Sequence, residues 1–284
     1  MKTFLMIIAY IILAPILGAV LLGLDRRITA RMQGRVGPPI LQPLYDVLKL
    51  MEKENIVVRR SQNFYVAFFL MFMIFTGALF FAGKDLLLVI FALTLAEIFF
   101  VLGGYKASSP YSIIGSQRAM IQMMAYEPIV ILAAVGMYMV TKSFYITDII
   151  SYTKPIFYYL PGLLFAFIFI LPIKFSKSPF DLAYSHHAHQ ELVKGMTTEF
   201  SGRSLAMIEV AHWYENILML GFVWLFFANN ILIGIALTLA VYFLIILIDN
   251  TFARAKWEMT LMSAWLIGLL FGVGNIIYLF FIPR

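Results

Sequence analysis

The stretch "TFLMIIAYIILAPILGAVLLGL", residues 3–24, contains no charged side chain. A helix needs about 20 mostly apolar residues to cross the hydrocarbon core of a bilayer, so this stretch predicts a transmembrane helix. The rest of the chain is similar, since 62% of its 284 residues are hydrophobic and 13% are charged. An average soluble domain has roughly 25% charged residues. The sequence therefore predicts an integral membrane protein.

Seven further apolar runs of spanning or nearly spanning length follow the first. They cover residues 64–83, 85–104, 112–141, 157–173, 205–228, 231–249 and 259–282. The fourth and fifth of the eight runs are the least regular, because Pro128 interrupts one and the other is short and ends at Pro172. We predict an all-α integral membrane protein with about eight transmembrane helices, in one domain over residues 1–284.

The basic residues are unevenly divided between the two sides of this predicted bundle. Sixteen of the 21 Lys and Arg residues fall on one side, mostly in two long loops, residues 25–63 and 174–204. Lysine and arginine accumulate in cytoplasmic loops. We therefore predict a multi-pass protein of the cell membrane, with both long loops cytoplasmic and both termini outside. The basic residues form no single patch, so the expected surrounding is the lipid bilayer and not nucleic acid.

The first long loop contains a segment with helical periodicity. In "MQGRVGPPILQPLYDVLKLMEKE", residues 32–54, apolar residues recur at three- and four-residue spacings. They are Leu41, Leu44, Tyr45, Leu48 and Met51. Asp46, Lys49 and Lys53 lie on the other side, which predicts a cytoplasmic amphipathic helix at the membrane interface or against a partner.

Composition also limits the cofactors that this chain could hold. The chain has no cysteine, and iron-sulfur clusters are normally held by cysteine thiolates. No glycine-rich nucleotide motif occurs. His186, His187 and His189 lack the spacing of a helical ligand pair, so we expect proton transfer or partner docking there rather than metal binding.

Several ionisable residues fall within the apolar runs, where a charge is costly and indicates function. Glu97 lies near the middle of the third run, and Arg118 and Glu127 lie in the fourth. Pro128 removes a backbone donor beside Glu127 and frees a carbonyl group. In the sixth run Glu209, His212 and Asn216 share one helix face, with Glu215 beside them. The alternative is that these groups only satisfy one another inside the bundle.

The chain resembles a known family through a series of motifs in a fixed order. They are Gly34-Arg35-Val36-Gly37-Pro38, Leu41-Gln42-Pro43-Leu44-Tyr45-Asp46, Gln117-Arg118-Ala119, Tyr126-Glu127, Ser178-Pro179-Phe180-Asp181, Gln190-Glu191-Leu192-Val193 and Thr198-Glu199-Phe200-Ser201-Gly202. Their order is similar to that in the H subunit of NADH:quinone oxidoreductase (subunit 1 in mitochondria). It is also similar to that in the related subunit of energy-converting, membrane-bound nickel-iron hydrogenases.

The resemblance implies a subunit that joins a peripheral redox arm to ion-pumping membrane subunits. By motif it assigns Glu127, Asp181, Glu191 and Glu199 to a line of buried acids that carries protons. Together with the intramembrane residues, the predicted proton path comprises Glu97, Arg118, Glu127, Asp181, Glu191, Glu199, Glu209, His212 and Glu215. Partner docking is expected at Arg35, Asp46, Lys49, His186, His187 and His189, and no catalytic or metal-binding residue is expected in this chain.

One departure from the family pattern affects the expected reaction. Quinone-reducing members have an acid-rich segment where this chain reads "LAYSHHAH", residues 182–189. The runs "HHAHQELVKG" and "EVAHWYEN" look more like the hydrogenase relatives. We therefore expect a ferredoxin-linked, hydrogen-evolving complex. Its nickel-iron centre and iron-sulfur clusters would lie on hydrogenase-like large and small subunits and an iron-sulfur subunit, beside antiporter-like membrane subunits.

Four alternatives remain open. The chain could line the quinone chamber of a quinone reductase or belong to a sulfur-reducing relative, because the electron-accepting chemistry lies largely on partners. A stand-alone secondary transporter with a site at Glu97 and Glu127 is more distant, since the chain shows no repeated halves. A purely structural anchor would retain full pumping after neutralisation of every buried acid.

Overall fold

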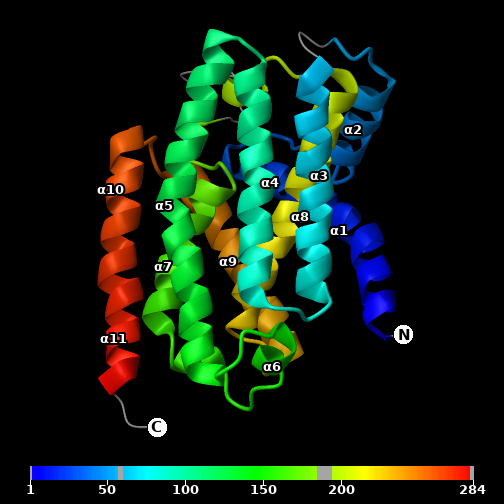
Figure 1. Cartoon of the computed structure of the whole chain (residues 1–284). Coiled ribbons are helices and arrows are strands. Elements are labelled where there is room, and N and C mark those ends of the chain that lie inside the picture. Colours follow the sequence, from blue (N-terminus) through cyan, green and yellow to red (C-terminus); the bar gives the residue numbers. More distant parts are fainter. Residues whose placement is uncertain (1, 57–59, 184–193, 282–284) are drawn as a thin grey trace. The chain divides into compact units, whose positions relative to one another are not determined.

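The computed structural model describes residues 2–56, 60–183 and 194–281, and within these ranges the chain is helical, with no strand beyond one isolated bridge between Asp85 and Tyr145 (Figure 1). The long helices are α1 (Lys2–Met32), α3 (Arg60–Phe81), α4 (Leu86–Lys106), α5 (Pro110–Thr141), α8 (Gly202–Leu225) and α9 (Ile231–Thr251). The shorter ones are α2 (Gln42–Glu52), α6 (Ile146–Ile150), α7 (Pro161–Lys174), α10 (Trp257–Ile267) and α11 (Gly274–Phe281). Two 3₁₀ turns cover Ile156–Tyr158 and Gly195–Thr197, and a π-helical segment, Gly268–Val273, joins α10 to α11.

Within the described residues, each of the eight predicted apolar runs falls on a helix, but six helices are long and apolar enough to cross a membrane. Those six lie within α1, α3, α4, α5, α9 and the continuous α10–α11 segment. The predicted count of eight spans is therefore not confirmed. With 14 residues, α7 is about 21 Å long, short of the roughly 30 Å hydrocarbon core. In α8, polar residues such as Glu209 and Glu215 interrupt the apolar sequence.

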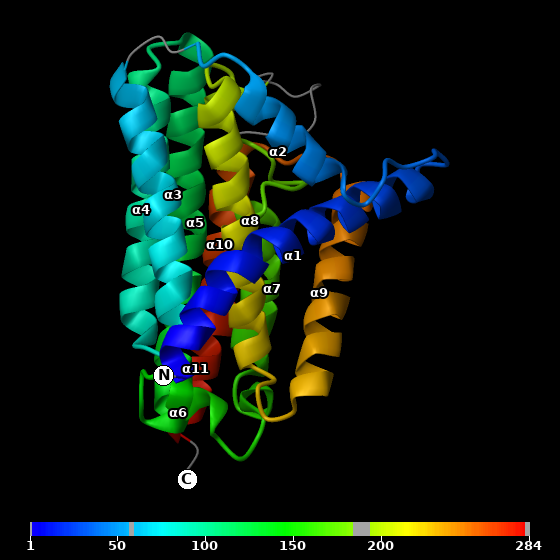
Figure 2. The same cartoon turned by 90° about the vertical axis from the view of Figure 1, so that its right-hand side faces the viewer.

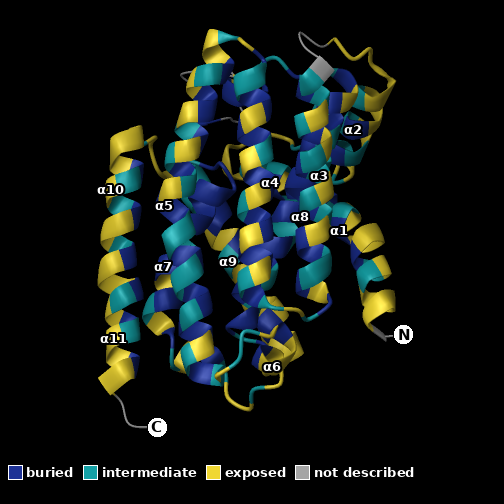
Figure 3. Ribbon diagram, in the orientation of Figure 1, coloured by how far each residue is buried: buried dark blue, intermediate teal, exposed yellow. Residues whose placement is uncertain are grey.

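The chain divides into two compact units that interleave in sequence. Unit 1 comprises Met1–Ala82, Ala92–Met120 and Leu182–Leu218, and unit 2 comprises Gly83–Phe91, Ile121–Asp181 and Met219–Arg284. Exposed residues follow one face of several long helices (Figure 3). In the apolar window of α4, 56% of the residues are buried, against 28% in those of α1 and α9. The prediction of a single domain over residues 1–284 stays a prediction.

In unit 1 the tilted helix α1 packs closely against α8 (Figure 2). A Cβ atom at Gly18 would lie 2.7 Å from the Cβ of Trp213, so only glycine allows this approach. A small apolar cluster surrounds the contact, formed by Ala19, Leu22, Val47, Ala206 and Trp213. Val47 belongs to α2, so α2 packs on α1 and α8 through this cluster.

Most of the predicted apolar face of α2 is exposed among the described residues, and the helix packs on unit 1 mainly through other side chains. Four of the five residues on the predicted apolar face are exposed: Leu41, Tyr45, Leu48 and Met51. The inward contact uses Val47 instead, with Leu44 and Leu50 beside it. The helix therefore has an apolar face packed on unit 1 and an adjoining apolar stripe that nothing in the described residues covers.

In unit 2 the short helix α7 lies in an aromatic core and is capped by a distant side chain. Phe167 packs against Phe222 and Phe226, with ring centroids 6.0 and 6.1 Å away. The side-chain oxygen of Asn275 accepts hydrogen bonds from the backbone N–H groups of Gly162 and Leu163, at 2.8 and 3.1 Å. These two donors belong to the first turn of α7 and have no partner within the helix.

Two prolines lie inside long helices, and each carbonyl group that they free finds a donor. A proline has no N–H for the carbonyl four residues earlier. Pro15 in α1 frees the carbonyl of Ile11, which accepts a hydrogen bond from the Tyr214 hydroxyl at 2.6 Å. In α5, which continues through Pro128, the freed carbonyl is that of Met124. The Trp265 indole N–H donates to it at 3.1 Å.

Candidate functional site

A buried acid–base pair lies on α8 in unit 1. The Nδ1 atom of His212 is hydrogen-bonded to Glu215 Oε2 at 2.9 Å, and the two residues are 8% and 5% exposed. The rings of Phe69 and Phe100 lie 5.5 and 5.3 Å from the imidazole ring in edge-on geometry. The pair is thus held in an aromatic surrounding.

Glu97 lies on the helix face that points toward this pair. It is 7% exposed and precedes Phe100 by three residues on α4, so the two side chains share a face. Because Phe100 packs on His212, this face of α4 is directed at α8. The structure therefore brings Glu97, His212 and Glu215 into one region of unit 1. Glu209 is half-buried and lies one turn before His212 on α8.

The segment that carries Glu199 is fixed against α4 and α5 in unit 1. The Ser112 hydroxyl donates hydrogen bonds to the carbonyls of Gly104 and Met196, at 2.8 and 3.1 Å. Met196 is fully buried, and its N–H donates to the Ala183 carbonyl. Glu199, three residues later, is half-buried, as is Arg118 on α5. The backbone near Glu199 is therefore anchored inside unit 1.

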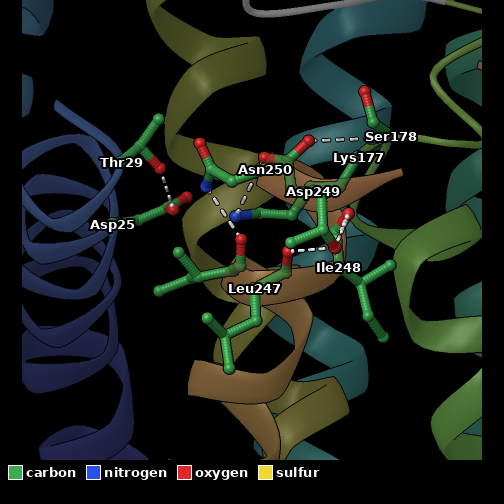
Figure 4. Close-up of polar contacts among 10 residues, drawn as sticks. Asp25, Thr29, Lys177, Ser178, Leu247, Ile248, Asp249 and Asn250 are labelled. Carbon is green, nitrogen blue, oxygen red and sulfur yellow. Dashed lines mark hydrogen bonds and ion pairs between the residues drawn. The ribbon is translucent and has the colours of Figure 1, made fainter. Parts of the chain in front are cut away.

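In unit 2, the segment Ser176–Asp181 is tied to the end of α9. Asp249 accepts a hydrogen bond from the Ser178 N–H at 2.9 Å, and its second oxygen lies 3.7 Å from Lys177 Nζ (Figure 4). Lys177 also lies over the Tyr242 ring. Asp249 was not among the predicted site residues, because its sequence position at the end of an apolar run resembles an ordinary helix terminus.

Asp181 is held by a second ion pair at the same segment. Its Oδ2 atom lies 3.2 Å from Arg254 Nε. Burial raises the pKa of the Asp181 carboxyl above its ordinary value, and Arg254 only partly opposes this effect. Gln122 on α5 donates to the Phe180 carbonyl at 2.6 Å, and the Ala255 N–H donates to the Pro179 carbonyl at 2.9 Å. The segment is thus fixed by side chains from three parts of unit 2.

A buried lysine lies beside the Tyr126-Glu127 pair on α5. Lys174 Nζ is 3.4 Å from the Tyr126 hydroxyl and 4.5 Å from the centre of its ring, and Lys174 is 5% exposed. Glu127 itself is half-buried. Sequence reasoning missed Lys174, although a lysine directly after the apolar run 157–173 was an available signal.

The predicted docking residues are only partly described. Arg26 Nη1 lies 2.8 Å from Asp46 Oδ2, while Arg35 and Lys49 are exposed. Partial burial raises the pKa of Asp46, but hydrogen bonds from Arg26 and Gln42 and the nearby cations outweigh it, so this pKa lies below its ordinary value. His186, His187, His189 and Glu191 lie outside the described residues.

A metal site is not formed by the described residues, in which no three His, Asp or Glu side chains gather as candidate ligands. The expectation that this chain binds no metal or cofactor stays a prediction, because the three histidines of residues 186–189 lie outside the described ranges.

Comparison with known proteins assigns the chain to a family. The NADH dehydrogenase family matches residues 4–280. The H subunit of NADH-quinone oxidoreductase from Syntrophotalea carbinolica is 31% identical over 97% of this chain and 91% of its own length. A putative NADH-ubiquinone oxidoreductase of Methanocaldococcus jannaschii is 34% identical over 76% of this chain and 73% of its own.

Among solved structures, a chain of the membrane-bound sulfane sulfur reductase, an archaeal respiratory membrane complex, matches with a TM-score of 0.84 and 25% identity. The match covers 98% of this chain and 100% of the other. The predicted relationship is thus confirmed, and the chain belongs to the NADH dehydrogenase family as a homologue of the H subunit of NADH-quinone oxidoreductase.

Proposed function

We propose that this chain is the membrane anchor and proton-path subunit of a redox-driven ion pump of the ferredoxin-linked, hydrogen-evolving type. Membership of a family of oxidoreductase membrane subunits supports the general role. Electrons would pass through clusters on partner subunits to a nickel-iron centre. This chain would hold the redox arm at the membrane and pass protons toward antiporter-like subunits, with its large loops cytoplasmic and both termini outside.

The observation that carries the proposal is the buried pair of His212 and Glu215 on α8, together with the buried Glu97 on the face of α4 whose Phe100 packs on His212. A chain that needed only stability would be served better by apolar residues at such positions. The hydrogen bond between His212 and Glu215 provides a donor and an acceptor within one buried pair. A change of charge in the redox arm would shift the proton affinity of such groups, because their surroundings screen charge weakly.

Unit 2 would contribute a second set of titratable groups. Glu127 lies next to Tyr126, which contacts the buried Lys174. Asp181 is paired with Arg254. Asp181 and Arg254 are close enough to affect one another, and Glu127 is proposed by motif and by its position next to Tyr126, so both acids are proposed as steps of the proton path. Glu191, Glu199, Glu209 and Arg118 are proposed as further members by motif and position.

The electron acceptor has one strong alternative. The structural match to the sulfane sulfur reductase chain extends over its full length. This match supports a sulfur compound as the second candidate for the electron acceptor. The quinone alternative is disfavoured by residues 182–189, which carry no Glu.

The ion path is tested by Glu97→Gln in the intact complex reconstituted in vesicles. The substitution keeps the size of the side chain and removes its titration. We expect normal assembly and electron transfer but a reduced ion gradient per turnover, with the same result for Glu127→Gln. Glu258→Gln, which alters an exposed glutamate at the start of α10, is the matched control and should pump normally. A full gradient per turnover in Glu97→Gln would refute the role of Glu97.

The acceptor is tested separately, on the complex isolated in mild detergent through a tag on this chain. Stoichiometric nickel together with hydrogen evolution from reduced ferredoxin would support the hydrogenase type. Reduction of polysulfide without nickel or hydrogen would identify the sulfur-reducing type and leave the ion-path proposal in place.

A further inference from the structure

The exposed apolar stripe of α2 is the least accounted-for surface of unit 1. Leu41, Tyr45, Leu48 and Met51 are between 46% and 58% exposed, and they follow one another at the three- and four-residue spacing of a single helix face. The proposed ion path uses none of them. In water such a stripe would be unfavourable, so it indicates a surface that is covered in the native setting.

The depth of α2 can be read from its neighbours within unit 1. Just after α2, the Ile56 N–H donates to the Ser201 hydroxyl at 3.0 Å, directly before α8 begins. Ser204, in the first turn of α8, is hydrogen-bonded to Asn63, in the first turn of α3. Because α3 is long and apolar enough to span, α2 lies level with the end at which α3 enters the membrane. This level is the membrane interface.

A basic cluster adjoins the start of the stripe. A Cβ atom at Gly23 would lie 1.8 Å from the Ile40 carbonyl oxygen, so the chain before α2 touches α1 one turn before Arg27. Arg27 and Arg31 are exposed on one face of α1, and neither has an ion pair within the described residues. Arg35 lies beside the end of α1, because its backbone N–H donates to the Ala30 carbonyl, and it is also exposed. Arg26 does not add to the cluster, since Asp46 neutralises it.

We infer that α2 lies in the plane of the membrane interface and, with the end of α1, forms a binding site for anionic phospholipid. The apolar stripe enters the part of the acyl chains next to the headgroups, and the phosphate of the headgroup is bound by Arg27, Arg31 and Arg35. An interfacial helix combines apolar burial with attraction to anionic lipids in this way. A protein partner is less suitable, because the stripe lies at the depth of the lipid and not beyond it.

Insertion of the stripe is tested with a dye on α2. The chain has no cysteine, so Leu48→Cys introduces one labelling position in this subunit. The complex that contains the unaltered chain is labelled in parallel, to determine how much dye attaches to cysteines of partner subunits. In reconstituted vesicles, lipids spin-labelled near the carbonyl group are expected to quench a dye at position 48 by more than about half. A dye at Lys53→Cys, at the polar end of the helix, should be quenched much less. Equal quenching at both positions would overturn the proposal. So would a dye at position 48 that the lipid quenches only after the soluble subunits are removed, because a protein partner would then cover the stripe.

Headgroup selection is tested with the same labelled protein. Spin-labelled phosphatidylglycerol and phosphatidylcholine are compared at equal mole fraction. Each arginine near an anionic surface contributes about fivefold in affinity, so phosphatidylglycerol should quench several-fold more strongly. The double substitution Arg27→Gln and Arg31→Gln should remove this preference, while Lys84→Gln with Lys142→Gln removes two exposed charges elsewhere and should retain it. No preference in the unaltered chain would overturn the headgroup assignment.

Discussion

The Trp265 indole nitrogen lies 3.1 Å from the carbonyl oxygen of Met124 and donates a hydrogen bond to it. That carbonyl lacks its usual backbone donor, because residue 128 is a proline. Lipid offers no replacement donor, and every polar backbone group within the hydrocarbon must be satisfied by the protein. The indole therefore allows α5 to continue through Pro128.

Trp265→Phe is expected to destabilise the protein by about 1 kcal/mol, the usual net value of one hydrogen bond. The aromatic ring remains, so the loss of stability measures the contribution of the indole N–H group. In a Pro128→Ala background the backbone donor returns, and the same substitution should cost close to nothing. The measurement is the unfolding midpoint in mixed detergent micelles, with Trp257→Phe as the control. An equal cost in both backgrounds would contradict this explanation.

Tyr214→Phe should act in the same way on α1. The Tyr214 hydroxyl serves the Ile11 carbonyl that Pro15 frees, and the predicted loss is about 1 kcal/mol. Pro15→Ala should remove most of the penalty. The exposed Tyr278→Phe, which should have no effect on stability, is the matched control. A Pro15→Ala background that leaves the loss unchanged would show that packing of the ring is responsible.

Asp181 should make stability depend on pH in a defined direction. Its folded pKa is raised above the ordinary value of 3.8 by burial, so folding favours the protonated form. The contribution of this carboxyl is complete below that value and is lost as the pH rises through the folded pKa. The thermal midpoint of Asp181→Asn should therefore rise relative to that of the unaltered complex as the pH increases above 3.8. Arg254→Gln removes the opposing cation and should move the transition to higher pH, and a shift to lower pH would contradict the assignment.

Asn275 should be replaceable by Asp but not by Leu. Its side-chain oxygen accepts from Gly162 and Leu163 at the start of α7, and a carboxylate there would also favour the positive end of the helix. Asn275→Leu removes both acceptor contacts and should cost about 1 to 2 kcal/mol. The aspartate variant should retain most of the stability, despite losing the bond to the Tyr159 carbonyl. Equal losses would indicate that the cap is not what Asn275 contributes.

The helices were predictable because each depends on a continuous local pattern. An uninterrupted apolar run predicts a helix irrespective of its neighbours, and all eight runs lie on helices in the described part of the chain, although α7 and α8 are not among the candidate spans. The face that α2 buries was not predictable from its periodicity. Both of its sides carry apolar residues, and the choice of Val47 depends on Ala19, Ala206 and Trp213, which lie on other helices.

The sequence indicates the ionisable residues within apolar runs, but not the residues that contact them. An ionisable residue inside an apolar run is visible by itself, as Glu97 shows. Asp249 contacts Ser178 across 71 positions, and Tyr214 contacts Ile11 across 203. No spacing rule connects positions so far apart in one sequence. The buried Lys174 shows the same limitation, because its importance depends on Tyr126 of another helix.

The cap on α7 has a consequence for biogenesis. Gly162 and Asn275 are 113 residues apart, which a ribosome needs on the order of ten seconds to add. During that interval the membrane contains a short helix with two unsatisfied N–H groups and no Asn275 to bind them. Insertion factors that shelter α7, or a delay of its entry into the lipid until α11 has been made, would remove this penalty. The cap of α7 can therefore form only after residue 275 has been made.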